Sequence, residues 1–554
     1  MALTGTGCTH GSSPLLILLL LLLPAMACLA ADTRIRLNSL GFLPGQEKRA
    51  SVAAQCSEFT VRRASDGETV LTGRATGPID NPDTKEKLWL ADFSSLKDAG
   101  AYALDVPGVG RSIPFRVGAD VYNDALRTAL KAMYLWRCGC AVEATYQGST
   151  FGHAACHTKD AYLDYVGGGH VVRPSVGGWH DAGDFNKYVV NAGVTVGVML
   201  MAWEQYNDRL RKLEAGLPES GNGIPDYLNE LKWEMDWLLT MQAEDGSVYH
   251  KVSTLSFGGF IPANEELTDR FITPWSSAAT ADFVAMAAKA SRAFQPYRSG
   301  YARQCLEAAR RSYTFLQAHP ENHSADLRGF STGGYQTRDD DDRLWAAAEL
   351  YETTGEEGYL KDFEARARRY QPLVDPSFGW SDVKDLGMLT YLLSRRPGRD
   401  PELVSQVRAS LLSAADGIVR TRNAHGYARP LGTTYFWGCN GDVAAQTVLL
   451  QAANRMRPNT DYVNTALDAL GHLFGRNFHC RSYVTGLGYN PPMHPHDRSS
   501  GSDKAEAPWP GYLVGGGHPD GTSWRDEQGR YDLNEIAINW NAPLIYALAS
   551  FASR

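Results

Sequence analysis

The chain has 554 residues, 44% of them hydrophobic, and a formal net charge of −8 at pH 7. A chain of this length usually forms more than one domain, and its apolar content is sufficient for a large core. The mild acidic charge, without any basic run or face, argues against a nucleic-acid partner.

The N-terminus is predicted to be a signal peptide. Residues 15–23 form an apolar run, LLILLLLLL, which is too short to span a bilayer, and the small-residue stretch PAMACLAAD follows it. We therefore expect a signal over residues 1–31, cleaved after Ala27, Ala30 or Ala31, and a secreted protein, extracellular or periplasmic. The stretch before the apolar run lacks Lys and Arg, and Cys28 leaves lipoprotein processing as an alternative. No other segment is apolar enough to cross a membrane.

Residues 32–118 have the pattern of short strands. FTVRR and TVLTG flank the turn SDGE, and AYALDV and SIPFRV flank the turn PGVG. In AYALDV the side chains of Tyr102, Leu104 and Val106 lie on one side of an extended chain. Strands of this length between Gly, Pro and Asp turns predict a β-sandwich.

Residues 119–554 change to a helical period. In IPDYLNELKWEMDWLLTMQ, Pro225 suits a first helical turn, and Leu228, Leu231, Met235 and Leu238 line one face. Comparable segments start near Ala125, Lys187, Ala278, Tyr301, Arg343, Tyr359, Leu386, Glu402, Val443, Tyr462 and Ile536. About twelve helices are predicted, with no convincing strand between them. Because there is no fixed repeat and the connections differ greatly in length, a closed ring of six helical hairpins is favoured over a solenoid.

Three polar loops carry the most specific motifs. GGWHDAGD, residues 177–184, places Asp181 and Asp184 three apart directly after His180, so each carboxylate makes the other harder to ionise. SYVTGLGYNPPMHPHDR, residues 482–498, runs Ser-x-Val-Thr-x-x-Gly-x-Asn and then His-Pro-His-x-Arg. WRDEQGRYDLNEIAINWNA, residues 524–542, runs Trp-x-Asp, then Tyr-x-x-x-Glu-x-Ala, then Asn-Ala.

These motifs resemble those of glycoside hydrolase family 9, a family dominated by cellulases. The second and third loops resemble its two signature patterns, and GGWHDAGD resembles a motif from the N-terminal part of its catalytic domain. The predicted sandwich resembles the immunoglobulin-like module that precedes many of these catalytic domains. The resemblance covers nearly all of the mature chain, and it implies a mainly α fold, an (α/α)6 barrel, behind the immunoglobulin-like β-sandwich.

The family implies hydrolysis of β-1,4-glucosidic bonds with inversion at the anomeric carbon. Inversion needs a carboxylate that activates water and a carboxylic acid that protonates the leaving oxygen. By resemblance, Asp184 is the general base, Asp181 helps to hold the same water, and Glu535 is the general acid. Glu535 is expected where the last helix begins, and a helix N-terminus lowers a carboxyl pKa. Burial and the nearby charges of Asp526 and Asp532 would raise it, and the sequence leaves the balance open.

Further residues of the motifs are candidates for catalysis and binding. His496 and Arg498 match the substrate-contacting His-x-Arg of the family, and we group His496 with the catalytic residues. Asp526 matches the signature aspartate and is expected to support Glu535 or the sugar. Flat aromatic faces stack on sugars, with packing in the core or at the rim as the alternative. The candidate platforms are Tyr531, Trp437 and Trp345.

Cysteine and histidine residues cluster in WRCGC and HAACH, which suggests metal chemistry. By resemblance to family members that carry the immunoglobulin-like module, the zinc ligands are Cys138, Cys156, His157 and His180. Two thiolates and two imidazoles form a closed, structural zinc site. Cys140 in place of Cys138 and His153 in place of His157 are alternatives. A set of reduced or disulfide-paired core cysteines is another.

Two acidic segments are predicted to bind structural calcium, because hard oxygen ligands suit that ion. Both resemble calcium sites of the family. The ligands in ESGNGIPD are Glu219, Asn222 and Asp226. The ligands in RDDDDRLW and WSDVKD are Asp341, Asp342 and Asp382. For RDDDD, the solvated acidic start of a helix is the alternative.

We therefore expect a secreted endo-β-1,4-glucanase that acts on cellulose-like or mixed-linkage glucans, as a monomer. The alternative is an exo-acting cellodextrinase or glucosaminidase on short β-1,4 oligosaccharides. The absence of a carbohydrate-binding module after the predicted barrel mildly favours soluble glucans or oligomers. A non-catalytic glycan-binding protein would be expected to lack one of Asp181, Asp184 or Glu535, and all three are present.

Overall fold

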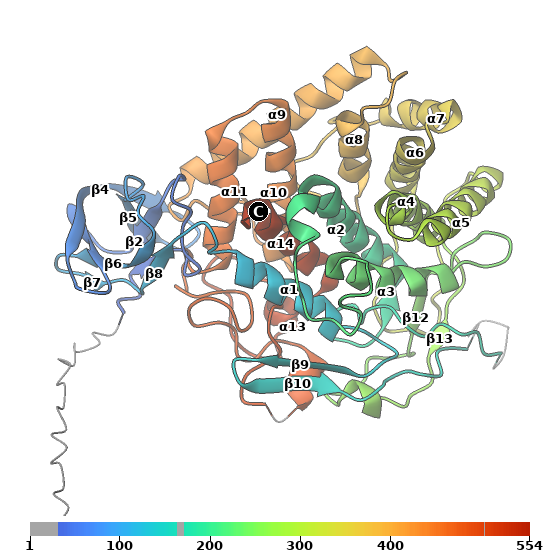
Figure 1. Ribbon diagram of the computed structural model, residues 1–554, viewed down its shortest axis with the longest axis horizontal. Helices are drawn as coiled ribbons and strands as arrows, with labels where there is room; N and C mark the ends of the chain where they lie inside the picture. The colour runs from blue at the N-terminus through green and yellow to red at the C-terminus, as the bar shows by residue number, and fades with distance from the viewer. Residues whose placement is uncertain (1–30, 163–170, 504, 554) are drawn as a thin grey trace, which may run out of the picture.

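The computed structural model describes residues 31–162, 171–503 and 505–553. A small β unit lies beside a larger helical unit (Figure 1). The predicted signal peptide, up to residue 30, lies outside the described residues. Within the described ranges, none of the helices combines the length and apolarity that a membrane crossing requires.

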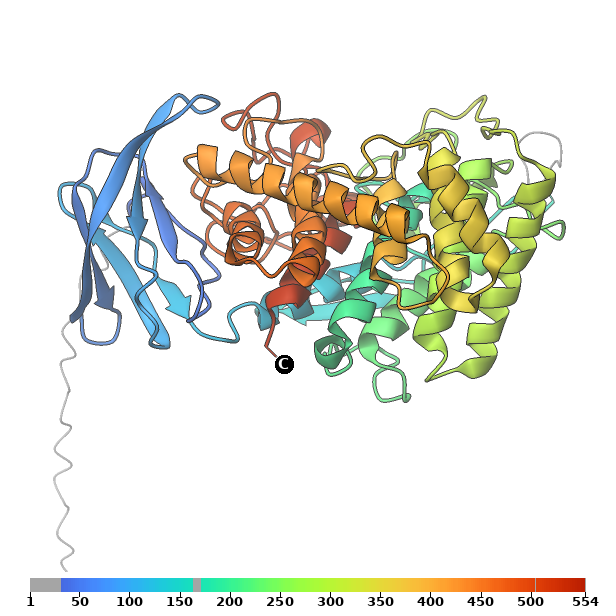
Figure 2. The ribbon, with the colours of Figure 1, turned by 90° about the horizontal axis from the view of Figure 1, so that it is seen from above.

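The N-terminal unit is the predicted sandwich, seen edge-on at the left of Figure 2. Its strands are β1 (Ile35–Arg36), β2 (Arg49–Val52), β3 (Glu58–Arg63), β4 (Thr69–Asn81), β5 (Glu86–Asp92), β6 (Gly100–Val106), β7 (Gly110–Arg111) and β8 (Phe115–Val117). They are ordered β1-β2-β5-β4-β3-β6-β7, with β8 paired to β6. The long β4 joins the two halves, because its first residues pair with β3 and its last with β5. The alternation predicted for β6 is confirmed, since Tyr102, Leu104 and Val106 are buried in the core of this unit.

The helical unit contains a long helix at each of the twelve predicted places. These are α1 (Asn123–Leu135), α2 (Val189–Leu210), α3 (Asp226–Thr240), α4 (Ser277–Phe294), α5 (Ser299–Ala318), α6 (Asp340–Thr354), α7 (Glu357–Ala367), α8 (Lys384–Leu393), α9 (Pro401–Ala424), α10 (Cys439–Met456), α11 (Thr460–Leu473) and α14 (Ile538–Phe551). Shorter helices are η1 (Ala263–Glu265), α12 (Arg498–Ser502) and α13 (Tyr531–Asn534).

The helices differ in how much of their surface is buried. Nearly every residue of α4 and α14 is buried, and small side chains such as Ala279 and Ala287 let neighbouring helices approach closely. Helix α2 packs against α4 and α14, α4 against α6, α6 against α8, and α10 against α14. By contrast, α9 buries a single stripe that includes Leu403, Val407 and Leu411, as expected for an outer helix. The polar loops that precede the buried helices are therefore brought towards one end of the unit.

The expectation of no strands among the helices is wrong. A hairpin is formed by β9 (Val142–Tyr146) and β10 (Ser149–His153), and a small sheet has the order β11 (Lys187–Tyr188), β12 (Lys251–Ser253) and β13 (Phe271–Ile272). These strands are two to five residues long. Runs this short carry too few alternating positions for a period to be recognised.

Candidate active site

A cleft of about 710 Å³ lies where α6, α8, α10 and α14 begin and where the loop before α2 approaches them. Asp181, Asp184 and Glu535 all line it. Aromatic side chains line it as well, among them Trp380 and Trp437. A cavity of about 990 Å³ at the opposite ends of α2, α4 and α10 contains none of the candidate catalytic residues. The candidate chemistry therefore belongs to the cleft.

Short backbone pairings bring the three motifs together. Ala182 forms an antiparallel bridge with Ala537, which joins the first motif to the third. His496 forms a parallel bridge with Glu535, which joins the second motif to the third. Segments more than 300 residues apart in sequence are thus placed side by side by main-chain contacts, which are stiffer than side-chain contacts.

Gly183 lies at the centre of this arrangement. Its carbonyl accepts hydrogen bonds from the backbone N–H of Arg498 at 3.1 Å and from the guanidinium of the same residue at 2.6 Å. Its backbone N–H donates to the carboxyl group of Glu535. A Cβ atom at this position would lie 2.2 Å from the carbonyl oxygen of His496. Only glycine allows this approach, and Gly183 lies between the two aspartates, directly before Asp184 and two positions after Asp181.

Asp184 is buried among hydrogen-bond donors. The amide of Asn186 donates to Oδ2 at 2.6 Å, and the hydroxyl of Tyr188 donates to the same oxygen at 3.0 Å. Burial raises the pKa of Asp184, whereas the charge of Arg498 and these two donors lower it. Donors and a nearby guanidinium stabilise the ionised carboxylate, which is the form a general base needs.

Asp181 has partners of its own. The amide of Asn191 donates to Oδ1 at 2.8 Å, and the hydroxyl of Tyr335 donates to Oδ2 at 2.7 Å. Burial and then the charge of Asp184 raise the pKa of Asp181 well above its usual range. The two aspartates therefore titrate as a pair, and the group nearer the guanidinium, Asp184, is favoured to ionise first.

Glu535 does not start the last helix. It follows α13 and precedes α14 by three residues, so no helix N-terminus acts directly on it. Burial and then the charges of Asp184 and Asp181 raise the pKa of Glu535 well above its usual range, against Arg498 and the Gly183 N–H. The balance that the sequence left open therefore favours the protonated form, which an acid catalyst requires.

Arg498 binds main chain and aromatic rings. Besides the carbonyl of Gly183, its guanidinium donates to the carbonyl of Gly258 at 3.0 Å. It also lies 5.6 Å from the ring centroids of both Phe257 and Phe260. A substrate contact by Arg498 stays a prediction. The residue holds the Asp181–Asp184 loop and supplies positive charge beside Asp184.

His496 and Asp526 each make polar contacts with the main chain. Nδ1 of His496 is 2.7 Å from the carbonyl oxygen of Gln528, and burial lowers the pKa of the ring, which favours neutral imidazole. Asp526 accepts hydrogen bonds from the backbone N–H groups of Met493 and His494 and an ion pair from Arg481. Asp526 therefore fixes the 493–494 segment and also accepts a hydrogen bond at 3.3 Å from the amide of Asn534, the residue before Glu535. Its expected support of Glu535 or the sugar stays a prediction.

The three aromatic residues predicted to stack on sugar differ in their exposure. Trp437 and Tyr531 are 50% and 52% exposed, with ring centroids 5.4 Å apart, and Trp437 lines the cleft. Trp345 is 0% exposed, donates from Nε1 to Glu349 at 3.0 Å and packs closely on Gly197. The prediction that Trp345 stacks on substrate is therefore wrong, because the residue belongs to the core between helices.

Several cleft residues were missed. Asn186 and Tyr188 directly follow the GGWHDAGD motif, so their proximity to Asp184 was a signal that went unused. Tyr335 and Trp380 come from separate loops, and no local pattern marks them. Tertiary structure alone brings the hydroxyl of Tyr335 to Asp181.

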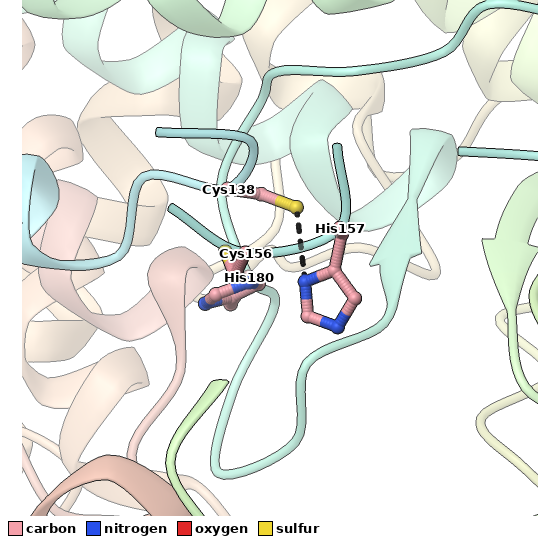
Figure 3. A group of neighbouring side chains, drawn as sticks. All are labelled: Cys138, Cys156, His157 and His180. Carbon is pink, nitrogen blue, oxygen red and sulfur yellow. Dashed lines mark hydrogen bonds between the residues drawn. The ribbon is translucent and has the colours of Figure 1, made fainter. Parts of the chain in front are cut away.

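The four predicted zinc ligands form a compact group (Figure 3). One ligand atom from each of Cys138, Cys156, His157 and His180 lies within 4.8 Å of all the others. Cys138 Sγ is 3.5 Å from His157 Nδ1, and Cys156 Sγ is 3.7 Å from His180 Nε2. Zn–S and Zn–N bonds of about 2.3 and 2.0 Å place ligand atoms of a tetrahedral site roughly 3.3–3.8 Å apart. The donor set and its spacing therefore fit zinc.

The alternatives for this group lie outside it. Cys140 and His153 do not belong to the cluster, and Nδ1 of His153 is 2.6 Å from the carbonyl oxygen of Ala154. Every cysteine in the described ranges is free, so disulfide pairing is excluded there. His157 Nε2 is 3.2 Å from Glu266, which is the kind of partner that orients a metal-bound imidazole.

The first predicted calcium site is contradicted at Glu219. Both carboxylate oxygens of Glu219 accept hydrogen bonds from the guanidinium of Arg137, which would repel a cation. The side-chain oxygen of Asn222 accepts from the backbone of Ile224 at 2.8 Å. Oδ2 of Asp226 accepts three hydrogen bonds within its loop. Protein donors thus already occupy these oxygens.

The second predicted calcium site splits into two places. Asp341 and Asp382 remain close, and burial, with a contribution from Asp382, raises the pKa of Asp341 to about 6. Asp342 instead points into the core and is 0% exposed, and burial and then the charge of Asp282 of α4 raise its pKa. Asp342 therefore faces Asp282 rather than Asp382 in this structure, because consecutive helical residues point about 100° apart.

A cleft with paired carboxylates, a third carboxyl group of raised pKa and aromatic walls is typical of a glycoside hydrolase. The model of glycosyl hydrolase family 9 matches residues 122–548, and that of the cellulase N-terminal ig-like domain matches residues 30–111. Endoglucanase D of Acetivibrio thermocellus is 58% identical over 525 residues, which are 94% of this chain and 84% of that protein.

Solved structures agree with this assignment. A metagenome-derived glycoside hydrolase family 9 endoglucanase superposes with a TM-score of 0.88 at 34% identity, over 94% of this chain and 99% of that one. A Zn-binding triple mutant of the GH family 9 endoglucanase J30 gives 0.86 at 34% identity, over 92% and 99%. The chain belongs to glycosyl hydrolase family 9, is a glycoside hydrolase, and carries an immunoglobulin-like domain at its N-terminus.

Proposed function

We propose that the protein is an endo-acting β-1,4-glucanase that hydrolyses internal bonds of cellulose-like or mixed-linkage glucans with inversion. The observation that carries this proposal is the convergence of Asp181, Asp184 and Glu535 in one aromatic-lined cleft. Exposed aromatic rings such as Trp437 offer stacking surfaces for several sugar units. The similarity to endoglucanases supports the choice of a polysaccharide substrate.

The chemistry follows from the carboxyl groups. Asp184 accepts a proton from water as the water oxygen attacks the anomeric carbon, and Asp181 accepts a hydrogen bond from the same water. Glu535 gives its proton to the leaving glycosidic oxygen, so one proton enters and one leaves the three-carboxyl set in each turnover. Tyr335 and Asn191 orient Asp181 for this role.

The architecture proposed for this activity has two domains. Residues 32–118 form the immunoglobulin-like domain, and residues 119–554 form an (α/α)6 barrel with α2, α4, α6, α8, α10 and α14 as its inner helices. The packing of α2 between α4 and α14 supports this arrangement. Residues 1–31 are proposed to be a cleaved signal peptide, so that a secreted monomer meets its polysaccharide outside the cell.

Structural metals are part of the proposal. Zinc held by Cys138, Cys156, His157 and His180 would supply a closed tetrahedral site next to Asp181 and would stiffen the catalytic loop. A calcium ion near Asp341 and Asp382 would relieve the repulsion between those carboxylates. Neither metal takes part in bond cleavage.

The test combines stereochemistry with two variants. Asp184→Ala and Glu535→Gln should each lose nearly all activity on carboxymethylcellulose, while the exposed Glu307→Gln of α5 should behave as wild type. NMR of the early reaction should show the α-anomer of the new reducing end. Viscosity should fall quickly relative to reducing ends released. Early β-anomer would refute inversion, and single sugars released at constant viscosity would favour the exo-acting alternative.

A further inference from the structure

The turn between β4 and β5 of the immunoglobulin-like domain contacts the helical domain. In Figures 1 and 2 the sandwich lies beside the orange and red segments of that domain. Asp83, in this turn, lies 3.2 Å from Nε2 of His425 and accepts a hydrogen bond from the hydroxyl of Tyr435 at 2.6 Å. The neighbouring Asn81 accepts a hydrogen bond from the backbone of Gly426 at 2.9 Å. The turn thus forms hydrogen bonds with both ends of the 425–435 segment.

The contact is buried and charged. The side chains of Asp83 and His425 are each 3% exposed. Burial opposes ionisation of Asp83, but the hydrogen bonds from His425 and Tyr435 outweigh it and leave the pKa below its usual value. A buried carboxylate with two donors from another domain holds those donors in place, because each would lose a charge-assisted hydrogen bond by moving.

The 425–435 segment continues directly into the wall of the cleft. Tyr435 is followed by Phe436 and Trp437, which are 38% and 50% exposed and line the cleft with the catalytic carboxyl groups. Two residues after Trp437, the backbone of Cys439 donates to the carbonyl of Phe436 at 3.0 Å as α10 begins. Trp437 is therefore held between an anchor on the sandwich and the first turn of α10.

Tyr435 is also held by contacts within the helical domain. The guanidinium of the buried Arg429 lies 3.9 Å from the ring centroid of Tyr435 and donates to the carbonyls of Gly432 and Thr434. These contacts restrict Tyr435, so its hydroxyl can move only together with Asp83. Displacement of the hydroxyl would be transmitted along the two peptide units of main chain that lead from Tyr435 to Trp437.

We propose that Asp83 of the immunoglobulin-like domain is a positioning residue for the cleft, which sets Trp437 for glucan binding through Tyr435. The proposal rests on the proposed function, because the ligand of Trp437 is taken to be a β-1,4-glucan. A purely adhesive interface would hold the domains together without affecting the cleft. The positioning role predicts a coupling between Asp83 and Trp437, although the two residues belong to different domains.

The experiment uses the full chain with Glu535→Gln, so that cellohexaose is bound but not cleaved. Asp83→Asn and Tyr435→Phe should each weaken cellohexaose binding by about three- to tenfold, the coupling expected within one hydrogen-bond network. Together they should weaken it no more than either alone. In a Trp437→Ala background the effect of Asp83→Asn should disappear.

The matched control is Glu47→Gln. Glu47 also lies on the sandwich and pairs with Arg422 of α9 at 2.8 Å, a contact that precedes the 425–435 segment and does not involve the Tyr435 hydroxyl. Its loss should lower Tm without changing cellohexaose binding. Equal weakening by Glu47→Gln, or an undiminished Asp83→Asn effect without Trp437, would overturn the proposal. Tyr435→Phe serves if Asp83→Asn fails to fold.

A ligand-free measurement separates this proposal from the proposed function. Asp83→Asn should change acrylamide quenching of tryptophan fluorescence when Trp437 is present and leave it unchanged in Trp437→Ala. An identical change in both backgrounds would refute the positioning role, whatever the protein binds. A Trp437-dependent change, together with no hydrolysis of glucan by the wild-type chain, would refute only the proposed function.

Discussion

Replacing Gly183 with alanine tests whether main-chain contact between the motifs sets the catalytic geometry. The new Cβ would lie 2.2 Å from the carbonyl oxygen of His496, so the two segments must separate by about 1 Å to reach normal contact. The backbone bridges would carry that shift to both Asp184 and Glu535. A misplacement of about 1 Å can cost roughly a hundredfold in rate, and overpacking costs about 1–3 kcal/mol of stability.

The assay compares kcat on a soluble β-1,4-glucan and Tm for Gly183→Ala and for Gly259→Ala. Gly259 is a fair control, because a Cβ there would meet nothing within 4 Å. Gly183→Ala should lose about a hundredfold in kcat with a lower Tm, while Gly259→Ala should match wild type. Should Gly183→Ala keep more than about half of the wild-type kcat, geometry set by this close approach would not limit catalysis.

Three further changes have distinct expected outcomes. The folded pKa of Asp342 is raised, so the free energy of unfolding falls as pH rises through that pKa. Asp342→Asn should therefore raise Tm more at pH 8 than at pH 5, by about 1 °C or more. An equal shift at both pH values would count against the raised pKa. Cys156→Ser should abolish one zinc per chain and lower Tm by several degrees; washed wild-type protein with well under one zinc would contradict this. Trp345→Phe should lower the free energy of unfolding by about 1–3 kcal/mol and leave KM unchanged. Trp437→Ala should raise KM several-fold. A raised KM in Trp345→Phe with an unchanged KM in Trp437→Ala would indicate that Trp345 binds substrate.

Sequence patterning sufficed for the helices and for the three carboxyl groups that line the cleft. The long helices were predictable because each buries either a regular stripe, as α9 does, or nearly its whole surface of small residues, as α4 does. Asp184 and Glu535 were predictable because they stand in long motifs. What the motifs could not convey was the environment that separates their pKa values, since Arg498 acts through space.

The wrong predictions share a physical cause. Asp341 and Asp342 are neighbours in a run of acids, and only the packing of α6 against α4 decides which one faces the core. Trp345 lies one turn further along the same helix and is buried for the same reason. Tyr335 was missed because its partner, Asp181, is distant in sequence. Such errors arise where a side chain's direction depends on a neighbour that local sequence does not specify.

The three carboxyl groups of the cleft must divide into a base and an acid, although burial raises the pKa of all three. Burial therefore cannot make the distinction, and the difference must come from their neighbours. After burial, the largest influence on Asp184 is the stabilising charge of Arg498, whereas the largest on Glu535 is the charge of Asp184 itself. Ionisation of the base thus helps to keep the acid protonated, since a proton on Glu535 relieves repulsion from Asp184. The guanidinium that binds the carbonyl of Gly183 therefore favours the charge on Asp184, and that charge raises the pKa of Glu535 by more than the guanidinium itself lowers it.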